Sequence, residues 1–267
     1  MANLTGNFSF TGSISNLSAY KRRDLDKVIL RTKGGAGKEK IKKDPAFALT
    51  RKHNTEWKGV TAAGKSFRMG IYAVKHLADY NISGPLNALC KHIQKADTVG
   101  NAGERSIYIT THPYILEGFD LNKRNPFDGI IRHPITCSVD RNNISAMINI
   151  PLLIPGISFK NPGKQKFYRL IFMLGAVSDY VYDENRKMYK PRDTDAVNID
   201  VLAETAWLPD TAERPAETII LQAKDGIILS DHTSLIISAG IEFGAPDALG
   251  VLQYVPYSGS AKVLKLG

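Results

Sequence analysis

Cysteine is scarce in this 267-residue sequence, and no apolar run is long. Cys90 and Cys137 allow at most one disulfide, and two cysteines in a chain of this size are typical of reduced, buried small side chains. The longest apolar stretches, such as 148–157 and 170–177, are too short for a bilayer, which takes about 20 apolar residues. The start, MANLTGNFSF, lacks the basic and apolar regions of a secretory signal. These absences predict a soluble, cytoplasmic protein without a membrane span.

The common catalytic and cofactor motifs are also missing. The six histidines are scattered, none with a second ligand at metal-binding spacing, and no G-x-S-x-G motif occurs. Segment 34–38 (GGAGK) has the glycines of a phosphate loop, but Thr32 and Glu39 stand where a Walker A loop needs Gly and Ser or Thr. We therefore expect no cofactor, metal or catalytic residue. An enzyme of another design would need a composite site, with candidates Glu104, Arg105, His112, Glu117, Asp120 and His133.

Positive charge, by contrast, is abundant and concentrated at one end. Residues 1–65 contain 14 Lys and Arg against five Asp and Glu, whereas residues 66–267 contain 21 of each kind. The net charge of +9 therefore belongs to the N-terminal part. Such a segment suits a polyanion or an acidic protein surface as its partner.

The basic segment has the pattern of a β arm. Residues 4–18 place Phe8 and Phe10 at strand spacing between glycines, which predicts an extended arm or short hairpin. Residues 27–32 (KVILRT) have strand composition and end at Gly34-Gly35, where a turn is favourable. We interpret the region as a basic hairpin. The candidate partner-binding residues are Lys21, Arg22, Arg23, Lys27, Arg31, Lys33, Lys38, Lys40, Lys42 and Lys43.

Helical signals follow. Asp44-Pro45 is typical of a helix start, with Asp as N-cap and Pro at the first position. Apolar residues then recur every three or four positions from Val60 to Ala78, and again from Leu86 to Ile93. The first stripe is expected to pack on one face of a sheet, because an amphipathic helix must bury its apolar side.

From Ser106 onward the pattern becomes β. Ile107 and Ile109 alternate with polar neighbours, and so do the apolar residues of 144–150. Further apolar runs are separated by Pro and Gly, which indicates about eight short strands in an antiparallel sandwich. The predicted fold is α+β, with a basic β arm at 1–43, two or three helices at 44–97 and the sandwich at 98–267.

Several segments resemble an uncharacterised family of Bacteroidota proteins. They are GSISNLSAYK at 12–21, KKDPAFALTR at 42–51, GER at 103–105, LEGFDLN at 116–122 and AGIEFG at 239–244. The resemblance covers most of the chain and implies one continuous family unit. It carries no activity that could be transferred to residues of this sequence.

Two hypotheses remain for the basic arm. In the first, the protein is a non-enzymatic, self-assembling structural subunit whose arm contacts the sheet edge or acidic loops of another copy. In the second, the arm binds nucleic acid or another polyanion through its phosphates, although only Tyr20 is available for base stacking. A solvated arm whose charge has no function is the third alternative.

Overall fold

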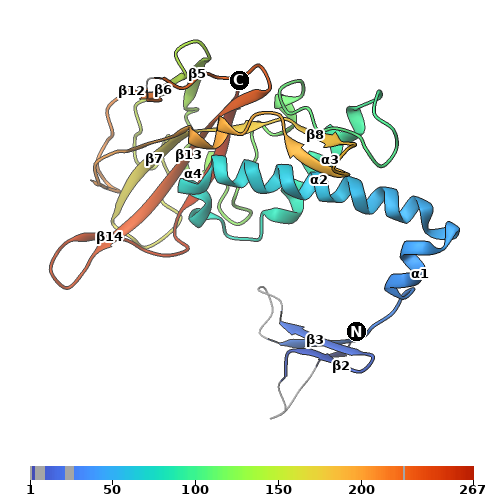
Figure 1. Ribbon diagram of the computed structural model, residues 1–267. Coiled ribbons are helices and arrows are strands. Elements are labelled where there is room, and N and C mark those ends of the chain that lie inside the picture. The colour runs from blue at the N-terminus through green and yellow to red at the C-terminus, as the bar shows by residue number, and fades with distance from the viewer. Residues whose placement is uncertain (1, 4–9, 22–26, 225) are drawn as a thin grey trace. The chain divides into compact units, whose positions relative to one another are not determined.

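The chain divides into two compact units, residues 1–51 and residues 52–267 (Figure 1). We call them unit 1 and unit 2. The computed structural model describes residues 2–3, 10–21, 27–224 and 226–267. The fold is α+β, with a few helices and antiparallel sheets that form a sandwich.

Unit 1 is built around one antiparallel sheet. Its strand order is β1-β4-β3-β2, and a short helical segment follows it. The elements are β1 Ala2–Asn3, β2 Gly12–Ile14, β3 Leu17–Lys21, β4 Val28–Thr32, α1 Lys38–Lys43 and the 3-10 turn η1 Pro45–Phe47. A short hairpin, β2–β3, therefore lies where the sequence predicted an arm or hairpin. Phe8 lies outside the described residues.

The predicted basic hairpin around Gly34-Gly35 is wrong. Strand β4 forms as expected, but it pairs with β3 and β1, and the basic residues after the turn form helix α1. The reason is local: KEKIKK consists almost entirely of good helix formers. Glu39 also lies one turn before Lys42 and Lys43, with N–O distances of 3.5 and 3.7 Å.

The predicted helix start at Asp44 is confirmed. The Asp44 carboxylate accepts a hydrogen bond from the backbone N–H of Ala46 (2.9 Å), with Pro45 at the first position of η1. Helix α2, Ala48–Gly70, continues from there. The apolar stripe does not stay in one helix to Ala78, because α2 ends at Gly70 and the 3-10 helix η2, Tyr72–Leu77, continues it.

The remaining helices belong to unit 2. They are α3 Ser83–Ala96, the 3-10 turn η3 Pro113–Ile115 and the single turn α4 Phe127–Ile130. The strand expected at Ser106 does not form beyond an isolated bridge between Ile107 and Tyr180. Asp179 ends the alternation early, because its carboxylate accepts hydrogen bonds from the backbone and side chain of Thr110 (2.9 and 2.7 Å).

Two sheets make the sandwich, and a separate ribbon, β8–β9, has two strands. The larger sheet has the order β10-β7-β13-β14, with β11 on β7 and β15 on β13, and the smaller sheet has the order β12-β6-β5. The strands are β5 Thr136–Asp140, β6 Ser145–Ile150, β7 Phe167–Ser178, β8 Tyr180–Asp183, β9 Met188–Pro191, β10 Asp200–Glu204, β11 Leu208–Pro209, β12 Glu217–Gln222, β13 Thr233–Pro246, β14 Leu252–Tyr254 and β15 Ser260–Leu266, with the 3-10 turn η4 at Asp195–Asn198.

The first hydrophobic core lies between the two sheets. Alternate residues of β7, among them Leu170 and Phe172, contact Ile148 of β6 and Leu221 of β12. Strand β6 buries every second residue, as its predicted alternation requires.

The second core lies on the opposite face of the larger sheet, which α2, η2 and α3 cover (Figure 1). Phe67 and Val74 pack there against Ile171 of β7 and Ile236 of β13. The predicted packing of the apolar stripe on the sheet is thus confirmed. Because both faces of β7 are buried, its sequence is almost continuously apolar.

Candidate functional site

The predicted partner-binding residues all belong to unit 1, and eight of the ten lie in its described part. Arg22 and Arg23 lie outside the described residues. The other eight are exposed: Lys21, Lys27, Arg31, Lys33, Lys38, Lys40, Lys42 and Lys43. Unit 1 as a whole contains 11 Lys and Arg against four Asp and Glu, a net charge of +7.

These cations have few negative neighbours. Lys42 and Lys43 share the carboxylate of Glu39. Lys33 donates instead to the backbone oxygen of Ser15 (3.0 Å), and Arg31 lies over the ring of Tyr20, 5.4 Å from its centroid. Among the described residues, no carboxylate pairs with Lys21, Lys27, Lys38 or Lys40. These four exposed lysines are therefore available to attract a negatively charged partner.

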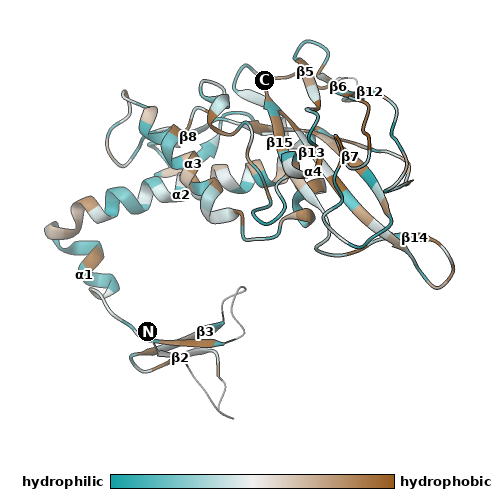
Figure 2. Ribbon diagram, turned by 180° about the vertical axis from the view of Figure 1, so that it is seen from behind, coloured by the Kyte–Doolittle hydropathy of each residue, from teal (hydrophilic) through white to brown (hydrophobic). Residues whose placement is uncertain are grey.

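The sheet of unit 1 has two unlike faces. Residues paired across strands share a face, as Ala19 and Leu30 do. One face is apolar and consists of Ile14, Leu17, Ala19, Val28 and Leu30, with Lys21 and Thr32 at its ends. The opposite face carries Ser13, Ser18, Tyr20, Ile29 and Arg31. In Figure 2 the apolar residues of these strands are brown.

The described residues of unit 1 form no hydrophobic core cluster of their own. Among its described residues only Ala19 and Ile29 are buried hydrophobic residues, and both core clusters consist of residues from unit 2. Ile14 is 58% exposed, and α1 has no buried residue, so α1 does not cover the sheet. A sheet face of this kind is normally covered by a second layer.

Unit 2 contains the most strongly perturbed carboxyl group, at Glu56 of α2. Its buried carboxylate accepts hydrogen bonds from Lys91 (2.5 Å), Arg105 (2.7 Å) and the backbone N–H of Gly103 (3.0 Å). Burial raises the pKa, but these hydrogen bonds outweigh it and lower the pKa of Glu56 to about 2. With every lone pair engaged, Glu56 joins α2, α3 and the 97–105 loop rather than offering a base.

The residues named for a composite active site do not share a set of contacts. Arg105 contacts Glu56, His112 contacts Tyr114, Glu117 contacts Leu266, and Asp120 contacts Asn122 and Phe127. The charge of Glu104 acts on Tyr189, and His133 lines the pocket described below. Within the described part of the chain, no three His, Cys, Asp or Glu residues group as metal ligands would. Cys90 is a free thiol, and burial raises its pKa to about 12.

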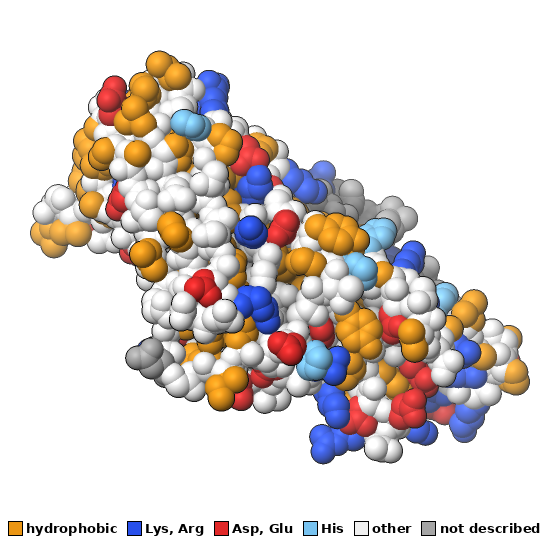
Figure 3. All heavy atoms as spheres, turned by 90° about the horizontal axis from the view of Figure 1, so that it is seen from above, with side chains coloured by type: hydrophobic (Ala, Val, Ile, Leu, Met, Phe, Trp, Pro, Cys, Tyr) orange, Lys and Arg blue, Asp and Glu red, His pale blue; other side chains and the backbone are white. Residues whose placement is uncertain are grey.

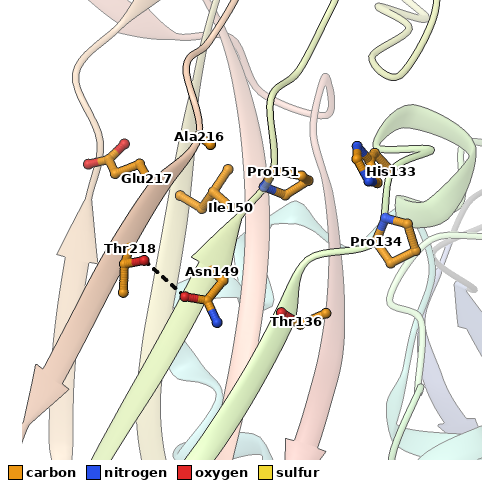
Figure 4. A pocket seen from close by; sticks show the side chains of 9 residues that line it. All are labelled: His133, Pro134, Thr136, Asn149, Ile150, Pro151, Ala216, Glu217 and Thr218. Carbon is orange, nitrogen blue, oxygen red and sulfur yellow. Dashed lines mark hydrogen bonds between the residues drawn. The ribbon is translucent and has the colours of Figure 1, made fainter.

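An open pocket of about 460 Å³ lies at one end of the smaller sheet. Thr136, Asn149 and Thr218 stand side by side on its three strands, and the Thr218 hydroxyl donates to Asn149 Oδ1 (2.9 Å) (Figure 4). Pro151 and the exposed His133 complete the rim. The lining also contains two titratable side chains, His133 and Glu217, and Glu217 pairs with Arg214 (3.4 Å), which does not line the pocket. These groups do not form a cluster that would support a reaction.

Sequence reasoning missed a second charged region, because the body was treated as one electrically balanced block. Unit 2 has 24 Lys and Arg against 22 Asp and Glu, and the two signs are interspersed over the face drawn in Figure 3. Residues 193–231, however, contain nine Asp and Glu against only Arg214 and Lys224, a net charge of −7. A count of charge in shorter windows would have found it. We call these residues the acidic segment.

Comparisons of the chain with protein-family models, curated proteins and solved structures found no match. None of the helices in the described ranges has both the length and the apolar character needed to cross a membrane. The function must therefore be argued from the surfaces of the two units.

Proposed function

We propose that this protein is a non-enzymatic structural subunit that assembles with copies of itself into filaments, tubes or particles, and that unit 1 makes the contacts between copies. The observation that carries the proposal is the composition of unit 1: a sheet with an apolar face, no described residue in either hydrophobic core cluster and a net charge of +7.

The energetics favour an intermolecular role for this unit. The described part of this sheet has two buried hydrophobic residues, so it gains little from the hydrophobic effect, which amounts to about 25 cal/mol per Å² of buried apolar surface. Covering the apolar face with part of another molecule would bury that surface and supply the hydrophobic stabilisation that unit 1 lacks. Strand β2 could also pair with a strand of another copy, because it is an edge strand whose three residues are all exposed.

The test is the size of the purified protein. Light scattering and negative-stain microscopy at micromolar concentration should show large assemblies of the full chain. A variant lacking residues 1–43 should remain folded, because both cores lie in unit 2, and should be monomeric. A full chain that stays monomeric throughout the micromolar range would exclude the proposal.

Nucleic-acid binding through the same cations is the second candidate function. Lys21, Lys27, Lys38 and Lys40 favour it, because they are exposed and have no carboxylate partner among the described residues. Neutralising several phosphates releases counterions, so binding should weaken steeply between about 50 and 200 mM salt. If a Lys-to-Ser variant of these four residues shifts DNA and RNA as well as the unchanged protein, this candidate fails.

A further inference from the structure

The acidic segment contributes an edge strand to each sheet of the sandwich. Strand β10 is the first strand of the larger sheet, and β12 is the first strand of the smaller sheet. The two edge strands are neighbours in the fold, so they lie on the same side of the sandwich. We call this side the acidic edge.

Strand β10 presents its acidic residues outward. Asp200, Leu202 and Glu204 are exposed, whereas Val201 and Ala203 between them pack against the first core. Only β7 pairs with β10 within the described ranges, so half of its backbone N–H and C=O groups point away from the sheet. Strand β10 therefore combines an open hydrogen-bonding edge with negative charge.

Most of this negative charge is not neutralised locally. Glu204 pairs with Arg169, and Glu217 pairs with Arg214 at 3.4 Å. Four further acidic residues are exposed and have no ion pair with any described residue: Asp195, Asp200, Glu213 and Asp231. Two acidic edges repel each other, which is a common protection of edge strands against pairing with their own kind. A positively charged partner would be attracted to the acidic edge and not repelled by it.

We propose that the acidic edge of one copy is the docking site for the basic unit 1 of a second copy. The net charges, −7 for the acidic segment and +7 for unit 1, are complementary. This inference rests on the proposed self-assembly and specifies its geometry. Because the two contacting surfaces differ, the interface is heterologous, and successive copies add head to tail into a ring or an open filament.

The test begins with charge-removing substitutions in the full chain. The acceptor variant combines substitutions at three exposed residues of the acidic segment, in β10 and beside it in sequence: Asp195→Asn, Asp200→Asn and Glu213→Gln. The matched control removes three exposed charges elsewhere on unit 2: Asp140→Asn, Glu184→Gln and Asp247→Asn. At 50 mM salt we expect the acceptor variant to raise the dissociation constant for assembly about 10- to 100-fold, and the control to change it less than about threefold.

A mixing experiment tests the head-to-tail geometry. The donor variant carries Lys38→Gln, Lys40→Gln and Lys42→Gln, which keep the helical propensity of α1. Alone, the donor and acceptor variants should each assemble poorly. Mixed in equal amounts, they should form dimers that do not grow, because one keeps an intact unit 1 and the other an intact acidic edge.

The possible results separate the two proposals. If the unchanged protein does not assemble, the proposed function itself fails. If it assembles and the acceptor variant assembles equally well, or the control variant is weakened as much, self-assembly stands and the acidic edge is not the docking site. A mixture that forms no dimers, although both variants are folded by circular dichroism, also overturns the head-to-tail assignment.

Discussion

Units 1 and 2 differ in how they obtain stability. Unit 2 stacks a helical layer and two sheets around two cores, which bury most of its large apolar side chains within one molecule. Unit 1 has a sheet of comparable strand number to the smaller sheet of unit 2, but only Ala19 and Ile29 are buried in its described part. The difference teaches that secondary structure alone does not make a self-sufficient unit, because burial needs a second layer.

The two units also differ in how completely their charged side chains are paired. In unit 2, the buried carboxylate of Glu56 is fully engaged with Lys91 and Arg105. In unit 1, exposed lysines outnumber the carboxylates available to them. Fully engaged charges hold a fold together, whereas unmatched exposed charges are available to a partner.

The largest expected contrast concerns hydrophobic residues. Phe67→Ala should lower the free energy of unfolding of unit 2 by about 3–5 kcal/mol, because it leaves a cavity between α2 and the sheet. Ile29→Ala in unit 1 should leave that transition unchanged. Urea denaturation of the full chain, followed by circular dichroism, measures both. An equal loss for both variants would mean that the units unfold as one.

Glu56→Gln should be the next most damaging change. The pKa of Glu56 rises from about 2 in the folded protein to about 4.5 on unfolding, so the ionised carboxylate stabilises the fold above pH 4.5 by about 3 kcal/mol. This contribution disappears as the pH falls from 4.5 to 2. We expect the variant to be less stable at pH 7 and less acid-sensitive in that window. Urea midpoints measured from pH 7 to pH 2 test both parts.

Gly175→Ala tests the close approach of α2 to strand β7. A Cβ at Gly175 would lie 2.1 Å from the backbone oxygen of Gly70, which must then move away. The expected loss of unfolding free energy is about 1–3 kcal/mol. The control is Gly84→Ala in α3, where a Cβ meets no atom within 4 Å and should stabilise the helix slightly. Equal thermal midpoints for the two variants would contradict this packing.

The smallest expected effects are those of salt concentration on assembly and on the unfolding of unit 2. Raising the salt from about 50 to 500 mM should weaken assembly roughly tenfold, since exposed charges are screened beyond a few ångströms. The unfolding of unit 2 should change by less than about 0.5 kcal/mol over the same range, because its cores are apolar. Sedimentation velocity and urea denaturation follow the two quantities. Assembly that strengthens with salt would point to apolar contacts in place of charge.

Local patterns in the sequence predicted much of the secondary structure. The Asp44-Pro45 helix start, the apolar stripe of α2 and the alternation of β6 are each visible in a few neighbouring residues. The hairpin expected at Gly34-Gly35 was wrong because the preference of KEKIKK for a helix was overlooked. Ile107 and Ile109 are buried as their pattern suggests, but the backbone N–H of Thr110 donates to the side chain of Asp179, far away in sequence, and not to a neighbouring strand.

For the candidate surfaces, the sequence revealed the excess of basic residues in unit 1 but not the acidic edge. The charge of residues 193–231 was hidden by basic residues elsewhere in the body. Even with that count, nothing in the chain indicates that β10 and β12 form edges on the same side. Edge positions follow from strand order, which depends on contacts between residues far apart in sequence.

The sequence by itself determined where charge and apolar residues accumulate, because those quantities depend only on residue type and spacing. Only the tertiary structure decided that both hydrophobic cores are built from residues of unit 2, and that the acidic segment supplies an edge strand to each sheet. Such outcomes depend on which layers pack together, and packing is settled by the total surface buried across the whole chain.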